Sequence, residues 1–122
     1  MSSKVTELVP LAQVADVERS IAFYQKLGLV LGGRTKGANM DFAGLRTESG
    51  RVVLMLSRGD APVAAEQRIL FYLYTPDLKG LRERLVAEGV AVSPIVPREY
   101  MRRGEVELAD PDGYTVLIGE DG

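Results

Sequence analysis

Two glutamates in the second half of the chain, Glu105 and Glu107, are the first candidates for chemistry. They lie two residues apart, a spacing that places both side chains on one face of a strand. Two carboxylates arranged in this way could hold a cationic ligand, or one of them could act as a general base. The same spacing fits a solvated strand face, so the sequence leaves both interpretations open.

The chain contains no histidine and no cysteine. Histidine is the usual general base near neutral pH and the commonest metal ligand, whereas cysteine supplies thiolate nucleophiles, disulfides and zinc ligands. Their absence excludes histidine-based triads and thiolate chemistry. If the protein is an enzyme, its acid or base has to be Glu, Asp, Tyr or Lys, and the candidates are Glu105, Glu107 and Tyr72.

The composition favours one compact, globular domain over residues 1–122, because 46% of the residues are hydrophobic and 26% are charged. The net charge of −2 argues against general binding to nucleic acid or to an anionic membrane. The N-terminus does not have the apolar core of a signal peptide, and the apolar runs are too short to span a bilayer. A cytoplasmic protein is expected.

The same pattern of elements occurs twice. An apolar run at residues 9–14 precedes Asp16, a helical stripe and Gly28, and a similar run at residues 69–74 precedes Asp77, a second stripe and Gly89. The aspartates are expected to cap the helices, and the glycines to end them. Strands are expected to open at residues 29–31 and 90–92, and further apolar strands follow Gly50 at 52–56 and Gly113 at 115–118.

The repeat predicts an α+β fold of two tandem βαβββ modules, residues 5–58 and 67–120, although two capped amphipathic helices could also match by chance. Each module would leave one face of a curved mixed sheet to be covered. This arrangement favours a cup-shaped site and a homodimer.

The residues at the two ends of this pattern resemble a known family. The stretch VADVERSIAFYQKLG at residues 14–28 resembles the opening signature of the vicinal oxygen chelate superfamily, and DPDGY at residues 110–114 resembles its closing signature. This superfamily contains glyoxalase I, extradiol dioxygenases, fosfomycin resistance enzymes and bleomycin resistance proteins. The resemblance covers nearly the whole chain and implies the duplicated βαβββ fold.

The resemblance also implies where metal ligands would lie in the metal-dependent members. Those positions correspond to Val9, Leu54, Leu70 and Leu117 in this chain. Apolar side chains offer no oxygen or imidazole donor to a cation. No metal and no cofactor are therefore predicted, and metal-dependent glyoxalase or dioxygenase activity is not expected.

Counting every second residue from these positions predicts the lining of the cup. The lining suits a flat, mostly apolar molecule held by stacking and a few polar contacts, unless a partner subunit or a helix covers the tyrosines. Residues 93–103 are expected to be irregular and to form either a lid or a loop at a dimer edge. The predicted ligand-binding residues are Val9, Leu11, Gln13, Leu54, Leu56, Leu70, Tyr72, Tyr74, Tyr100, Glu107 and Leu117, with Val52 and Thr115 beside them; no residue is assigned a catalytic role.

A narrower resemblance links DFAGLR at residues 41–46 and LMLSR at residues 54–58 to the bleomycin resistance proteins. Those members also lack the metal ligands, work as dimers and sequester their drug unaltered. Those proteins are usually strongly acidic and tend to have tryptophan in the binding groove. This chain departs from them, because its net charge is only −2 and it contains no tryptophan. These departures argue against the same drug and leave the mode of action unchanged.

Three hypotheses follow. The first is a metal-free homodimeric protein that sequesters or carries an aromatic or antibiotic-like ligand and so takes part in antibiotic resistance. The second is a metal-independent isomerase, cyclase or lyase with Glu and Tyr as acid–base groups. The third is a regulatory or structural dimer whose own side chains fill the cup.

Overall fold

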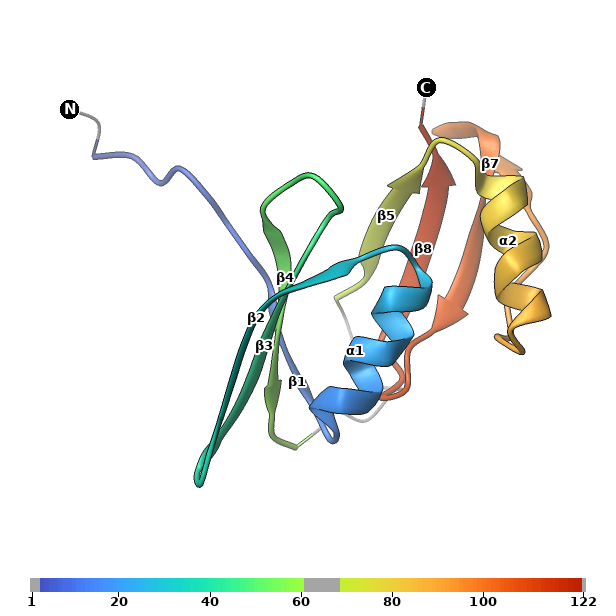
Figure 1. Cartoon of the computed structure of the whole chain (residues 1–122). Coiled ribbons are helices and arrows are strands. Elements are labelled where there is room, and N and C mark those ends of the chain that lie inside the picture. The colour runs from blue at the N-terminus through green and yellow to red at the C-terminus, as the bar shows by residue number, and fades with distance from the viewer. Residues whose placement is uncertain (1–2, 61–68, 122) are drawn as a thin grey trace. The chain divides into compact units, whose positions relative to one another are not determined.

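Each half of the chain folds into one helix and a four-stranded sheet (Figure 1). A computed structural model describes residues 3–60 and 69–121. The chain divides into two compact units, Met1–Ala61 and Pro62–Gly122. The predicted start of the second module, at residues 67 and 68, lies outside the described residues.

The first unit contains β1 (Leu11–Val14), α1 (Val17–Lys26), β2 (Val30–Gly37), β3 (Met40–Arg46) and β4 (Val52–Arg58). Its sheet has the strand order β1-β4-β3-β2. β1 is parallel to β4, and the other pairs are antiparallel. The helix therefore connects the two strands at opposite edges of the sheet.

The second unit contains β5 (Phe71–Thr75), α2 (Leu78–Ala87), β6 (Val96–Arg98), β7 (Met101–Ala109) and β8 (Thr115–Glu120). Its strand order is β5-β8-β7-β6, with β5 parallel to β8. This is the topology of the first unit repeated. The predicted α+β fold with two tandem βαβββ modules is confirmed.

The helix boundaries follow the predicted caps. Asp16 Oδ1 accepts a hydrogen bond from the Arg19 backbone N–H at 3.1 Å, and Asp77 Oδ1 accepts one from the Gly80 N–H at 3.0 Å. Each bond satisfies a backbone donor that the first helical turn leaves unpaired. Gly28 follows α1 with a φ of +101°, a conformation that glycine adopts without strain.

The start of the second strand of the second unit differs from the prediction. The strand was expected to open at residues 90–92, but β6 begins only at Val96. Ser93 makes the earlier contact with β7, donating its N–H to the Glu107 carbonyl at 3.0 Å and accepting the Glu107 N–H on its hydroxyl at 2.8 Å. Pro94 follows and has no N–H with which to continue a ladder.

Residues 93–103 were also expected to be irregular, and this prediction was wrong for most of the segment. β6 and the start of β7 form an antiparallel hairpin in which Arg98 pairs with Met101. The turn of this hairpin is Glu99 and Tyr100. Tyr100 is therefore held at the end of a paired structure.

One face of each sheet is covered by the helix of the same unit. In the first unit, Val17, Ile21 and Tyr24 of α1 are buried. In the second unit, Leu78 and Leu85 of α2 are buried, as are the alternate residues of β7 and β8. The buried strand residues are Ala12, Val14, Ala43, Leu45, Leu54 and Leu56 in the first unit and Val106, Leu108, Val116 and Ile118 in the second. We call the opposite side of each sheet its helix-free face.

Within residues 3–60 and 69–121, no helix combines the length and the apolar character that crossing a bilayer requires.

Candidate functional site

The helix-free face of the second unit carries a buried carboxylate, that of Glu105. Glu105 lies on β7 between Gly104 and Val106, and only 5% of its surface is exposed. Its partner across the ladder is Gly119 of β8. A Cβ atom at Gly119 would come within 2.8 Å of Met101 Cε and 3.0 Å of the Tyr72 hydroxyl. The glycine therefore leaves space for the Met101 side chain and for the Tyr72 hydroxyl, which contacts Glu105.

Side chains from two other strands of the sheet contact the two oxygens of this carboxylate. The Tyr72 hydroxyl, from β5, donates a hydrogen bond to Glu105 Oε1 at 2.8 Å. Arg98 Nε, from β6, lies 3.6 Å from Glu105 Oε2. The Arg98 contact is an ion pair without a hydrogen bond, because 3.6 Å is too long for one.

The carboxylate also changes the acidity of two phenols. Burial, followed by the hydrogen bond to Glu105, raises the pKa of Tyr72 to about 12. Glu105 also raises the pKa of Tyr100, mainly through a side-chain hydrogen bond. A phenol is already protonated at neutral pH, and the raised pKa extends this state to more alkaline pH, so both tyrosines act as hydrogen-bond donors and not as bases.

An aromatic surface adjoins the carboxylate. The ring centroids of Tyr72 and Tyr74 are 5.2 Å apart, with an angle of 34° between the planes. Tyr74 is 61% exposed and Tyr100 is 67% exposed. Exposed rings beside a buried charge can hold a flat molecule by stacking and orient it with one polar contact.

The other predicted residues of the second unit lie on or next to this face. Leu117 pairs with Tyr72 in the neighbouring strand and with Glu107 on the other side. Glu107 is exposed, and Leu70, which directly precedes β5, is 53% exposed. Glu105 and Glu107 thus share one face as predicted, but only Glu105 is buried.

The first unit divides the predicted residues between two faces. Leu11 pairs with Met55, and Gln13 pairs with Ser57. Leu11 and Gln13 are exposed and alternate with the buried Ala12, so they lie on the helix-free face. Val9 precedes β1 and is partly exposed.

Leu54 and Leu56 were expected to share this face, and that prediction was wrong. Leu56 pairs with Ala12 and Ala43, and all three are buried on the helix-covered face. The pairing of β3 with β4 shifts between Leu45 and Arg46, so the position that corresponds to Leu117 is one residue later than expected, at Met55. Val52, at the shift, and Thr115 of β8 are both partly exposed.

The side chains at the implied metal positions do not fit a divalent metal. Val9, Leu70 and Leu117 have no donor atom, and Met55, which takes the place expected for Leu54, offers only a thioether. In the described part of the chain, no group of three or more His, Cys, Asp or Glu side chains is placed to hold a metal ion.

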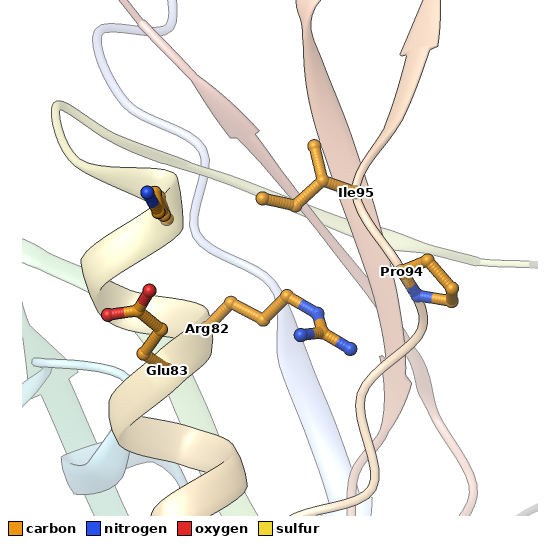
Figure 2. Close-up of a pocket in the computed structure, with 5 residues that line it drawn as sticks. Arg82, Glu83, Pro94 and Ile95 are labelled. Atoms are coloured by element: carbon orange, nitrogen blue, oxygen red, sulfur yellow. The ribbon is translucent and has the colours of Figure 1, made fainter.

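A separate pocket lies on the other side of the second unit, between α2 and the segment before β6. It has a volume of about 320 Å³, and its lining residues are Lys79, Arg82, Glu83, Pro94 and Ile95. Arg82 extends from α2 toward this segment (Figure 2), and its Nε donates to the Ser93 carbonyl at 2.8 Å. None of the predicted ligand-binding residues lines this pocket.

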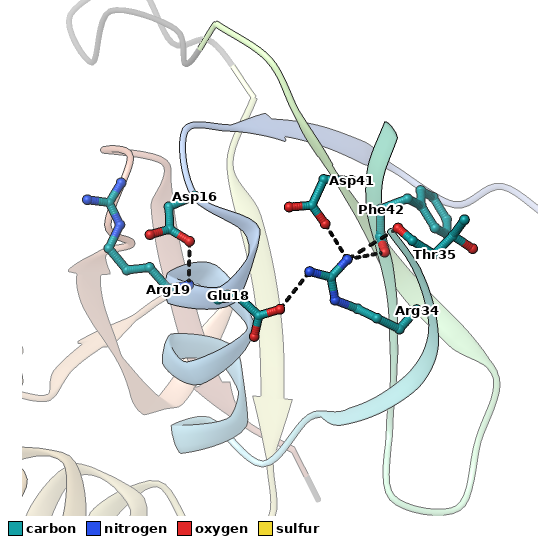
Figure 3. A network of polar contacts seen from close by, with 7 residues as sticks. All are labelled: Asp16, Glu18, Arg19, Arg34, Thr35, Asp41 and Phe42. Atoms are coloured by element: carbon teal, nitrogen blue, oxygen red, sulfur yellow. Dashed lines mark hydrogen bonds and ion pairs between the residues drawn. The ribbon is translucent and has the colours of Figure 1, made fainter. Parts of the chain in front are cut away.

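A polar network in the first unit is structural. The Arg34 guanidinium donates to Asp41, to the Phe42 carbonyl at 2.9 Å and to Glu18 of α1 at 2.6 Å (Figure 3). Arg34 thus ties α1 to the hairpin of β2 and β3. All of its acceptors belong to the protein itself, so the network provides no evidence of a ligand.

The sequence pointed to Glu105 and Tyr72, but it did not predict that Tyr72 and Arg98 both contact the Glu105 carboxylate. Glu105 and Tyr72 were considered as separate acid–base candidates, and Arg98 was not assigned to a site. The missing signal was the strand pairing that places β5 and β7 on either side of β8. Gly119, opposite Glu105 on β8, was a visible clue, since glycine inside a strand can mark a close approach of other groups.

The fold is shared with solved structures of antibiotic-binding and antibiotic-resistance proteins. A bleomycin-binding protein in complex with bleomycin has a TM-score of 0.75 and 17% identity, over 97% of this chain and 100% of that one. TnmS3, an antibiotic-binding protein from Streptomyces sp. CB03234, has a TM-score of 0.75 and 20% identity, over 99% and 100%. A bleomycin resistance determinant encoded on the transposon Tn5 has a TM-score of 0.76 and 16% identity, over 96% and 98%. At these identities the likeness shows the fold alone.

No curated protein is significantly similar to the chain in sequence. Residues 7–118, by contrast, match a family along most of the chain. The match includes the opening and closing signatures and both βαβββ units. The chain belongs to the Glyoxalase/Bleomycin resistance protein/Dioxygenase superfamily.

Proposed function

We propose that this protein binds a small aromatic or antibiotic-like molecule without a metal and sequesters or carries it unaltered. The observation that carries the proposal is the combination, on one sheet face, of the exposed Tyr74 ring with the buried Glu105 carboxylate. The ring offers a stacking surface, and the carboxylate with its Tyr72 partner offers an oriented polar group. Tyr100, Leu70, Leu117 and Glu107 complete the proposed site.

The solved relatives support the kind of ligand. One of them is a bleomycin-binding protein and another is an antibiotic-binding protein. The same fold is therefore able to bind such molecules. The ligand of this chain is proposed from its own residues, because its sequence differs from theirs at most positions.

The proposal includes a homodimer in the cytoplasm, as predicted from the sequence. Exposed apolar residues on the helix-free faces, such as Leu11 and Leu70, support a partner surface. The hypothesis of a self-filled cup loses part of its basis. Leu54 and Leu56, two of the residues that would fill the cup, lie in the helix-covered core.

One observation favours a second candidate function, a metal-independent isomerase, cyclase or lyase. Tyr72 and Glu105 form a direct hydrogen bond, so a phenol donor and a carboxylate acceptor lie together in a sheltered place. In that case Glu105 would act as the base and Tyr72 as the hydrogen-bond donor to developing negative charge.

A thermal-shift screen tests the proposed function. The protein is heated with a panel of aromatic antibiotics that includes bleomycin, and separately with divalent metals. A ligand at 100 times its dissociation constant adds about 2.7 kcal/mol to the free energy of unfolding, which corresponds to a rise of several degrees. We expect a rise with at least one aromatic compound, in the presence of a chelator.

Two variants locate the binding. Tyr74→Ala removes an exposed ring of the proposed site, and Val86→Ala removes a similarly exposed apolar group from α2. We expect Tyr74→Ala to abolish the ligand-induced rise and Val86→Ala to preserve it. A rise that survives in Tyr74→Ala, or one that requires a metal, would refute the proposed site.

A further inference from the structure

We infer that the ligand is a planar aromatic cation. In the ligand-free protein, the Arg98 guanidinium occupies the position beside Glu105 that the positive charge of the ligand takes on binding. The inference rests on the proposed function and names the chemical class of the ligand. It starts from the way in which the second unit holds the Glu105 carboxylate.

Glu105 is a buried charge that needs a cation nearby. Its side chain is only 6% exposed, and the hydrogen bonds that it accepts from Tyr72 and Tyr100 come from neutral phenols. A carboxylate removed from water is costly unless a positive charge or strong donors compensate it. Arg98 provides this charge to the other oxygen, Oε2, over 3.6 Å.

The pairing with Arg98 is weak enough to be exchanged. The distance leaves no hydrogen bond between the two groups, and half of the Arg98 side chain is exposed to solvent. Arg98 is also the last residue of β6, a strand of three residues at the edge of the sheet. It can turn into water without breaking the ladder, at a small cost.

A ligand cation with an N–H group would bind the same oxygen more closely. Hydrogen bonds between a cation and a carboxylate are shorter and about twice as strong as those between neutral groups. Tyr72, Tyr74 and Tyr100 lie around this point, and tyrosine rings attract cations as well as flat apolar surfaces. The exposed Glu107 on the same face adds negative charge.

The other charges of the hairpin do not take this role. Arg103 pairs with Glu120 at 3.7 Å. Arg102 is exposed on the same strand and provides a matched comparison, since its loss changes the net charge by the same amount as the loss of Arg98. The two arginines thus separate displacement at Glu105 from general attraction of a cation to a more acidic surface.

The experiment compares two dyes with the same ring system by fluorescence titration. At mildly alkaline pH, 9-aminoacridine is a cation with N–H donors and acridine is neutral. We expect the wild-type protein to bind 9-aminoacridine at least about tenfold more tightly than acridine, the ratio expected from one charge-assisted hydrogen bond. Glu105→Gln should reduce this preference to near equality while acridine binding persists.

Arg98→Met should tighten 9-aminoacridine binding by several-fold more than Arg102→Met does, because only Arg98 competes for Glu105. Circular dichroism checks that each variant is folded. If Glu105→Gln does not fold, the comparison of Arg98→Met with Arg102→Met still tests whether Arg98 competes with the ligand for Glu105.

The outcomes separate the inference from the proposed function. Equal binding of both dyes by the wild type, or equal effects of the two arginine substitutions, would overturn the cation inference and leave aromatic binding in place. Binding of neither dye, with no response to any compound of the antibiotic panel, would overturn the proposed function and the inference with it.

Discussion

Glu105 and Glu107 show how two residues of the same type acquire different properties from their neighbours. They lie on one face of β7, yet Glu105 is buried and Glu107 is exposed. Glu105 accepts a hydrogen bond from Tyr72 and forms an ion pair with Arg98, and Met101 lies with the Tyr72 hydroxyl over Gly119, the residue opposite Glu105. The local sequence around the two glutamates contains no sign of this, because Tyr72 and Arg98 come from other strands.

The hydrogen bond between Tyr72 and Glu105 should stabilise the fold. We expect Tyr72→Phe to lower the free energy of unfolding by about 1–2 kcal/mol, since it removes a donor to a buried carboxylate. Tyr74→Phe removes a hydroxyl from the exposed neighbour and should change stability by less than about 0.5 kcal/mol. Urea denaturation measures both, and equal effects would show that the bond contributes nothing.

Burial of the Tyr72 phenol, together with the same hydrogen bond, makes stability depend on alkaline pH. The pKa of Tyr72 is about 12 in the folded protein, above its ordinary value of 10.0. The folded state therefore favours the neutral phenol, and this stabilisation is complete below pH 10 and lost as the pH rises from 10 toward about 12. Wild type should lose more stability than Tyr72→Phe across that range, and parallel losses would contradict the assignment.

At the level of elements, the sequence predicted the fold well and the strand registers less well. Asp16, Asp77 and Gly28 mark the helix ends because capping depends on residues a few positions away. The face of Leu54 depends on a shift in its pairing with β3, a contact between different strands. A pattern with a period of two cannot reveal such a shift, and an error of one residue exchanges the two faces.

The face on which each leucine lies determines how much it contributes to stability. Leu56 is fully buried beneath α1, whereas Leu11 is 54% exposed on the helix-free face. Leu56→Ala should lower the free energy of unfolding by about 2–5 kcal/mol, as for other buried leucines. Leu11→Ala should change it by only about 0.5 kcal/mol. Urea denaturation measures both changes. Similar losses in the free energy of unfolding for the two variants would contradict the placement of Leu56 and Leu11 on opposite faces of the sheet.

At the level of the whole molecule, the two units share a topology but not a chemistry. Gln13, Ser57 and Phe42 form a row across the first sheet at the positions that Tyr74, Gly119 and Glu105 take in the second. The first row contains no charged group, and the second contains the buried carboxylate. The repeat could be read from the sequence because both units follow one pattern of turns and caps, but this difference needs the register of both sheets.

The proposed homodimer predicts the mass of the particle in solution. Sedimentation equilibrium should give twice the 13.3 kDa of one chain at micromolar concentration. Leu70→Glu should shift the protein toward the monomer, because a charge on an exposed apolar position of the proposed partner surface opposes association. A wild-type protein with the mass of one chain would exclude the dimer from the proposal.

The central claim is that the protein binds an aromatic molecule without a metal and without changing it. Isothermal titration calorimetry with the best compound of the panel, in the presence and absence of EDTA, followed by mass spectrometry of the recovered compound, tests this most directly. We predict the same affinity under both conditions and a compound of unchanged mass and chromatographic retention. Loss of binding with EDTA would show that metal ligands exist elsewhere, and a converted compound would show that the protein is an enzyme.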